Sequence, residues 1–174
     1  MRLSRLRVPL GYLVGALVVV LARPRTETVA AGMALAVLGE AIRIWASGHI
    51  EKTERLATGG PYAHTRNPLY VGSALMALGV AVASASVPVV IAVAAYFAIL
   101  YPPVIREESA FLAARFPGPY AAWARDVPAF LPRLRPAGPR ESRFGWARVR
   151  ANREWRTAAA LPVMAALLLA RARW

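Results

Sequence analysis

A short polar segment, residues 59–67, leads into an apolar stretch. Together with the first turn of that stretch, it carries the residue types best suited to chemistry in this chain. Arg66, Asn67 and Tyr70 lie within five positions of one another, and Tyr62 lies a few residues upstream. Spacings of three and four residues place the side chains of Arg66, Asn67 and Tyr70 on one face of a helix. Guanidinium, amide and phenol groups at the edge of an apolar helix could hold a water-soluble, anionic ligand beside a lipid phase.

The same segment begins a helix, which makes its arginine unusual. Asn is a favoured N-cap and Pro suits the first helical position, so Asn67 and Pro68 predict a helix start whatever the function. A cation such as Arg66 is unfavourable beside the positive end of a helix dipole unless an anion lies nearby. Two plainer interpretations stay open: Arg66 contacts phospholipid phosphates, and Tyr70 is an interfacial aromatic anchor.

Charged residues elsewhere are further candidates. Glu40 and Arg43 are three residues apart inside an apolar stretch, where charged residues are costly and often functional, although a purely structural ion pair is an alternative. Glu107 and Glu108 follow another apolar stretch at the end where Arg66 is expected, and they could instead be solvated carboxylates at a helix start. The chain has no cysteine and two histidines, so we expect no metal site.

The elements that must position these residues are apolar helices. The 174 residues are 57% hydrophobic and have a mean hydropathy of +0.42, which is more apolar than a typical soluble domain. We therefore predict an all-α, polytopic integral membrane bundle. Gly72 and Gly79, seven residues apart, predict a thin helix face that permits close packing. The predicted spans are four, with a possible fifth at the C-terminus: 8–22, 27–48, 68–84, 87–101 and then 157–170.

The regions between the spans have their own signals. Pro102 and Pro103 should end the fourth span. A short amphipathic helix is expected over 104–116, and a proline-rich, irregular stretch over 117–140. From 133 to 156, arginines alternate with aromatic residues, which predicts a basic segment at the membrane interface.

The charge distribution predicts partners and orientation. The net charge of +13 comes almost entirely from arginine. Because this charge lies beside apolar spans, we expect contact with anionic lipid headgroups at 133–156 and no nucleic-acid partner. The arginine bias places the 49–67 loop and the region after residue 104 in the cytoplasm, as in a protein of the bacterial inner membrane.

Several motifs occur in a recognisable order. They are Gly60-Pro61-Tyr62, the run from Arg66 to Gly72, Glu107-Glu108 and Phe116-Pro117-Gly118-Pro119-Tyr120. Over residues 37–132 this pattern resembles the isoprenylcysteine carboxyl methyltransferase family, and phospholipid N-methyltransferases share its broader form. Asn67 stands where that family usually has histidine. The resemblance implies a membrane methyltransferase core over 1–132. Beyond it, charge and composition alone predict the basic interfacial segment 133–156 and a C-terminal apolar helix over 157–174.

The resemblance also implies a cofactor and roles for the candidate residues. The cofactor is S-adenosylmethionine, bound in a pocket at the cytosolic face, and the substrate is a lipophilic molecule that enters from the bilayer. Arg43 would orient a substrate carboxylate, and Glu40 would fix Arg43. Glu108 is the third catalytic candidate, and it is also a second candidate, after Glu107, for the contact with the ribose hydroxyls or amino group of the cofactor. The cofactor-binding residues would be Tyr62, Arg66, Asn67, Tyr70 and Glu107.

Three functions remain open for the chain. Carboxyl O-methylation of an isoprenylcysteine-like acceptor is favoured because Arg43 offers a carboxylate a partner. N-methylation of a phospholipid or small amine is the second possibility, and it would need a glutamate to take up a proton. The third is a catalytically inactive membrane scaffold or lipid-binding protein.

Overall fold

The computed structural model describes residues 7–51, 55–138 and 142–173, and these residues form helices and loops with no strand among them. This confirms the all-α fold class. The helices are, in chain order, α1 (Arg7–Leu21), α2 (Thr26–Ser47), the 3₁₀ helix η2 (Gly60–Ala63), α3 (Pro68–Ser84), α4 (Val87–Arg115), α5 (Pro117–Asp126), α6 (Trp146–Ala151) and α7 (Trp155–Arg171).

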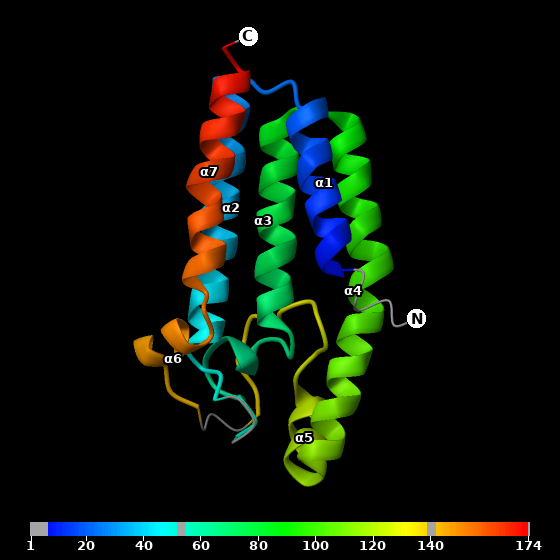
Figure 1. Cartoon of the computed structure of the whole chain (residues 1–174). Helices are drawn as coiled ribbons and strands as arrows, with labels where there is room; N and C mark the ends of the chain where they lie inside the picture. The colour runs from blue at the N-terminus through cyan, green and yellow to red at the C-terminus, as the bar shows by residue number, and fades with distance from the viewer. Residues whose placement is uncertain (1–6, 52–54, 139–141, 174) are drawn as a thin grey trace.

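One bundle contains α1, α2, α3, α4 and α7, while η2, α5 and α6 gather at one of its ends (Figure 1). α7 runs along α2 in the opposite direction, so the last apolar stretch is a helix of the bundle (Figure 1). At its far end, Arg171 donates hydrogen bonds from Nε to the carbonyl of Ala22 at 2.8 Å and from NH2 to the carbonyl of Val20 at 2.9 Å. The C-terminal helix thereby caps unpaired carbonyls at the end of α1.

α2 and α3 approach each other closely through glycines. A Cβ added at Gly39 would lie 2.6 Å from the backbone oxygen of Gly72, and one at Gly72 would lie 2.6 Å from the backbone oxygen of Gly39. Gly32 and Gly79 face each other in the same way. Small residues allow membrane helices to pack backbone against backbone, so the predicted thin face of α3 is confirmed. This contact fixes the start of α3 relative to α2.

α4 runs without a break through Pro102 and Pro103, which corrects the prediction that it ends there. Each proline removes one backbone donor, but packing against neighbouring helices can hold a helix together across such a gap. Tyr101 and Val104 are buried on either side of the prolines. Because the helix continues, Glu108 lies two turns beyond Tyr101 on the same face.

The prediction of an irregular stretch over 117–140 is wrong for its first part, where α5 forms. Pro117 occupies the first turn of α5, where a proline costs no intrahelical hydrogen bond. Tyr120 and Trp123 are buried and pack in one cluster with Tyr62. This aromatic cluster attaches α5 to the polar segment that precedes α3.

Two helices, α2 and α4, are long and apolar enough to cross a membrane, and α1 and α3 are shorter apolar helices. Large apolar side chains on these helices are exposed, among them Leu13, Leu38 and Ile91. Apolar surface of this kind suits a lipid environment rather than water. These features support a membrane location for the protein.

Candidate functional site

A tight turn and a short helix place the polar segment at the end of the bundle. Gly60 has a φ of +57°, which favours glycine, and a side chain there would meet the ring of His49. In η2, the carbonyl of Tyr62 accepts a hydrogen bond from Trp123 Nε1 at 2.9 Å. Burial, reinforced by the nearby carboxylate of Glu108, raises the pKa of the Tyr62 phenol, so this hydroxyl stays protonated.

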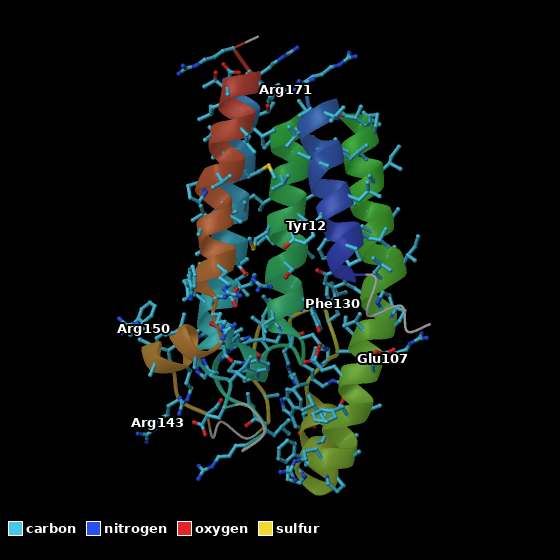
Figure 2. The ribbon with its side chains drawn as sticks, in the orientation of Figure 1. Tyr12, Glu107, Phe130, Arg143, Arg150 and Arg171 are labelled. Atoms are coloured by element: carbon cyan, nitrogen blue, oxygen red, sulfur yellow. The ribbon has the colours of Figure 1, made fainter. Side chains whose placement is uncertain are left out.

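The segment 127–137 lies along the polar segment and holds its backbone. The N–H of Arg66 donates to the carbonyl of Pro128 at 2.8 Å. Thr65 Oγ1 donates to the carbonyl of Phe130 at 2.8 Å, and Figure 2 shows Phe130 at this end of the bundle. The residues just before α3 are thus fixed by a part of the chain that follows α5.

Asn67 occupies the N-cap position of α3 but does not cap the helix with its side chain. Its Nδ2 instead donates to the carbonyl of Ala129 at 2.7 Å, which corrects the predicted capping role. Pro68 stands at the first helical position, as predicted. The amide of Asn67 therefore connects the start of α3 to the segment 127–137.

A cavity of about 300 Å³ opens beside the polar segment, and we call it the end cavity. The loop after α2, η2, the start of α3, the second half of α4 and α5 form its walls. The predicted site residues that line it are Tyr62, Arg66, Asn67, Tyr70 and Glu108. Three further charged residues, Glu51, Arg55 and Arg115, also line it. Apolar side chains, among them Leu112, Phe116 and Trp123, cover the rest of the wall.

Arg66 has donor capacity that the protein does not use. Its NH1 donates to the hydroxyl of Tyr120 at 2.9 Å, and its guanidinium carbon lies 5.9 Å from the centroid of the Tyr120 ring. Its Nε is buried, and within the described part of the chain it has no hydrogen-bond partner. Because an unpaired buried donor is costly, this arrangement fits an anion bound in the end cavity.

The two adjacent glutamates of α4 have different surroundings. The hydroxyl of Tyr70 donates to Glu108 Oε2 at 2.6 Å, and the ring of Tyr70 packs edge-on against Tyr101 with centroids 5.3 Å apart. Glu107 is exposed and lies outside the lining of the end cavity; Figure 2 labels it on α4. The structure thus brings Glu108 to the other candidate residues but leaves Glu107 away from them.

A second space runs between α1 and α7 and is bordered by α3 and α4. We call it the bundle groove; it consists of two overlapping cavities of about 510 and 400 Å³ that share Gly11, Ser73, Tyr96, Tyr101 and Thr157. Its far part is lined by apolar residues such as Val18 and Met164. Leu69 and Tyr70 line both the groove and the end cavity, so the two spaces meet at the start of α3.

Sequence reasoning missed several residues of the bundle groove. Tyr12, Tyr96, Tyr101 and Thr157 line the part nearest Tyr70, and Figure 2 labels Tyr12. Their only sequence signal is a polar group within or beside an apolar stretch. Aromatic residues that anchor helices at a membrane surface give the same signal.

Arg43 lies at the same end of the groove, and each of its guanidinium nitrogens is hydrogen-bonded within the protein. Nε donates to Glu154 Oε1 at 2.7 Å, and NH2 lies 2.6 Å from the same oxygen. NH1 donates to the hydroxyl of Ser73 and to the carbonyl of Leu69 at 3.3 Å. The expected pairing with Glu40 is present, but Glu40 Oε2 is 3.7 Å from Nε, so Glu154 is the closer partner.

Glu154 was not identified from the sequence. It lies 111 residues from Arg43, and no spacing rule connects positions so far apart. The only available signal was its place just before an apolar stretch, where an acidic residue is also favoured for capping a helix. Its pairing with Arg43 follows from the packing of α7 along α2.

Comparisons with known proteins bear on the family of the chain. The profile of the family described as phospholipid methyltransferase matches residues 13–118. A cobalt-zinc-cadmium resistance protein, CzcN, of Cupriavidus metallidurans is 44% identical over 105 residues, which cover 59% of this chain and 47% of that protein. A nickel-cobalt-cadmium resistance protein, NccN, of Alcaligenes xylosoxydans xylosoxydans is 37% identical over 105 residues with the same coverage.

The extent of these matches decides the family. The chain spans about half the length of the curated relatives it matches. No solved structure matches the chain. The match to the family profile covers more than half of the chain and contains the polar segment together with Glu108. The chain therefore belongs to the phospholipid methyltransferase family.

Proposed function

We propose that this protein transfers a methyl group from S-adenosylmethionine to a lipophilic acceptor. The observation that carries the proposal is that the charged end cavity and the largely apolar bundle groove meet at Leu69 and Tyr70. A charged, water-soluble cofactor suits the first space, and a lipid chain suits the second. Membership of a methyltransferase family supports the same class of reaction.

The residues of the end cavity fit this cofactor. Arg66 would hold its carboxylate through charge-assisted hydrogen bonds, which would satisfy the buried Nε. Glu108 would face its amino group or ribose hydroxyls. Tyr62, Asn67 and Tyr70 would line the adenosine, with the apolar wall covering the base. Glu107 is left out of this set because it lies outside the cavity.

The chain's own residues would orient the reactants and exclude water. When bound, S-adenosylmethionine supplies a methyl group that its positive sulfur already activates, so no covalent nucleophile is required. Leu69 and Tyr70 separate the two spaces, and the hydrogen bond from Tyr70 to Glu108 fixes that wall. Positioning and exclusion of water are the main contributions that such a site can make.

The contacts around Arg43 bear on the chemical group that accepts the methyl. A carboxylate acceptor was favoured because Arg43 could bind it, but the nitrogens of Arg43 already bond to Glu154, Ser73 and Leu69. An incoming carboxylate would have to displace Glu154. We therefore propose a lipophilic amine as the first candidate acceptor and the carboxylate of an isoprenylcysteine-like molecule as the second.

Two further features support the amine. Four tyrosines line the part of the groove near Arg43, and aromatic faces attract ammonium groups. Glu108 lines the end cavity and accepts a hydrogen bond from Tyr70, which lines both spaces. It could take up the proton that an ammonium group must lose before its nitrogen can attack the methyl group. A carboxylate acceptor is already ionised at neutral pH and releases no proton.

We place the bundle across the bacterial inner membrane, with the end cavity at the cytoplasmic face. The exposed aromatic residues Trp146 and Trp155 lie at that end of the bundle. Arg143 and Arg150 project away from the bundle beside them (Figure 2). This combination supports binding of the basic segment to anionic lipid headgroups. Vesicles with and without anionic lipid would test it, because only anionic vesicles should raise the melting temperature.

The relatives suggest a setting for the reaction. Both relatives are named as metal resistance proteins. In the part of this chain that the structure describes, no group of three or more His, Asp or Glu is placed to hold a metal ion. We therefore propose that any contribution of this chain to metal tolerance would come from methylation of a membrane molecule. Tolerance should then be lost on deletion and restored by wild type but not by Arg66→Ala.

Transfer of labelled methyl into lipid tests the proposed function. Purified protein is incubated with methyl-labelled S-adenosylmethionine and a total bacterial lipid extract, and the product is identified by mass. Mild alkali then separates the candidates, because a methyl ester is hydrolysed to methanol whereas an N-methyl group is retained. Absence of both transfer and S-adenosylhomocysteine binding would refute the enzyme and leave the scaffold or lipid-binding protein.

A further inference from the structure

Glu154 is a buried carboxylate to which the proposed function gives no role. Its side chain is almost fully buried, and it stands at the N-cap position of α7. It lies beyond residue 118, where the match to the family profile ends. Acidic side chains are rarely buried to this extent unless they are paired.

The backbone before Glu154 is arranged to direct it into the bundle. Arg153 has a φ of +57°, a left-handed conformation that residues other than glycine seldom adopt. The preceding side chain anchors this turn, because Asn152 Nδ2 donates to the carbonyl of Ser47 at 2.9 Å and to that of Ile50 at 3.3 Å. The turn between α6 and α7 is thus tied to the end of α2.

From this turn, Glu154 reaches α3 through one arginine. Glu154 Oε1 accepts from Arg43 Nε at 2.7 Å, and Arg43 NH1 donates to the carbonyl of Leu69 and to the hydroxyl of Ser73. The hydroxyl of Ser73 in turn donates to the carbonyl of Leu69 at 2.9 Å. Leu69 belongs to the wall where the end cavity meets the bundle groove.

A second carboxylate competes for the same arginine. Glu40 lies on α2, three residues before Arg43, with its Oε2 at 3.7 Å from Nε. Neither oxygen of Glu40 has a hydrogen-bond partner among the residues that the structure describes. Without Glu154, the guanidinium would be drawn toward Glu40 along its own helix and away from Leu69 and Ser73. Glu154 therefore selects the orientation of Arg43.

We propose that Glu154 is a positioning residue for the methyl-transfer step. It holds Arg43 against the first turns of α3 and so keeps the acceptor end of the bundle groove in shape. This inference rests on the proposed function. The segment that carries α6 and α7 would then contribute a positioning residue to the site, although it lies outside the family match.

The test compares Glu154→Gln with wild type in the full chain. The probes are S-adenosylhomocysteine for binding, and methyl-labelled S-adenosylmethionine with a total bacterial lipid extract for turnover. We expect turnover at saturating cofactor to fall at least tenfold while the affinity for S-adenosylhomocysteine changes by less than twofold. Glu27→Gln makes the same change at an exposed glutamate in the first turn of α2 and should match wild type in both measurements.

Two further variants separate positioning from simple loss of folding. Glu154→Asp keeps the charge on a shorter side chain and should recover part of the turnover. The double variant Arg43→Gln/Glu154→Gln should turn over no more slowly than Arg43→Gln alone, because Glu154 acts through Arg43. A double variant that turns over clearly more slowly than Arg43→Gln would contradict the link between the two residues.

The outcomes that overturn the inference are distinct from failure of the proposed function. Wild-type turnover in Glu154→Gln would overturn the positioning role. Turnover and S-adenosylhomocysteine affinity that fall by the same factor in the Gln and Asp variants would also overturn it, because that pattern indicates a general structural role. A wild-type chain that neither binds S-adenosylhomocysteine nor transfers methyl would refute the proposed function itself.

Discussion

The end cavity and the bundle groove share Leu69 and Tyr70, yet they are built differently. Loops and helix ends wall the end cavity, and Arg66 and Glu108 place charges on it. The sides of helices wall the groove, whose only strongly charged lining residue in the described chain, Arg43, is neutralised by Glu154. Under the proposed function, a charged ligand and a lipid would be recognised by separate walls. Variants in one space should therefore leave the other unchanged.

The largest difference between the two spaces should come from Arg66→Ala, which removes a charged side chain from the end cavity. Loss of hydrogen bonds to a charged group costs about 1.5–3 kcal/mol, so affinity for S-adenosylhomocysteine should fall roughly tenfold to a hundredfold. Isothermal titration calorimetry measures this change. Arg125→Ala removes an exposed arginine of α5 and should bind as wild type does. Wild-type affinity in Arg66→Ala would show that the cofactor binds elsewhere.

Gly15→Leu should produce the opposite pattern, because it acts on the groove. A Cβ added at Gly15 meets no atom within 4 Å, so the leucine side chain would enter the groove without a backbone clash. Methyl transfer into lipid should fall by about tenfold through misplacement of the acceptor, with unchanged S-adenosylhomocysteine affinity.

Gly118→Leu is the matched control for the groove variant. A Cβ at Gly118 also meets no atom within 4 Å, and Gly118 lies on α5 away from the groove. It should therefore transfer methyl at the wild-type rate. An equal loss of methyl transfer in both glycine variants, or full activity in Gly15→Leu, would show that the groove does not bind the acceptor.

Glu108→Gln should affect both measurements, since Glu108 lines the end cavity and holds Tyr70 in the wall shared with the groove. A neutral acceptor forms a weaker hydrogen bond than a carboxylate, so a loss of about fivefold in affinity is expected. Transfer to an amine should fall by more than that, because glutamine cannot take up a proton. Glu107→Gln is the neighbouring control. Its affinity and its rate of transfer should stay within about twofold of wild type, because Glu107 is exposed to solvent and lies outside the end cavity. A larger effect at Glu107 would reverse the assignment of the two glutamates.

The smallest effect is expected for Tyr62→Phe, which removes one neutral hydroxyl from the end cavity. Such a hydroxyl contributes about 0.5–1.5 kcal/mol, so affinity for S-adenosylhomocysteine should fall about threefold. Burial raises the pKa of Tyr62, which keeps the phenol protonated well into the alkaline range. The ratio of wild-type to variant affinity should thus be equal at about pH 7 and about pH 9.5. A ratio that shifts between these pH values would mean that Tyr62 ionises.

The parts of the structure that could be predicted depend on local chemistry. The apolar stretches, the helix start at Pro68 and the glycine face of α3 follow from composition and helical spacing over a few residues. Arg66 and Tyr70 both line the end cavity, but Arg66 precedes the N-cap of α3, so helical spacing does not account for their proximity. The other walls of the cavity come from distant segments that no sequence spacing connects.

The remaining parts depend on contacts between distant segments. Pro102 and Pro103 predict a helix end, but burial on both sides of them keeps α4 continuous. Asn67 is a favoured capping residue, but the segment 127–137 offers its amide a carbonyl instead. The sequence favours a substrate carboxylate as the partner of Arg43, because no sequence spacing connects Arg43 with Glu154. In each case tertiary packing outweighs the local preference.

The proposed function requires that the end cavity binds S-adenosylmethionine with its carboxylate on Arg66. An experimental structure of the chain with S-adenosylhomocysteine bound would test this most directly. We expect the ligand between Arg66 and Glu108, with its carboxylate within hydrogen-bonding distance of the Arg66 guanidinium. A ligand bound in the bundle groove, or beside His49 and Thr58 outside the end cavity, would contradict the proposed function.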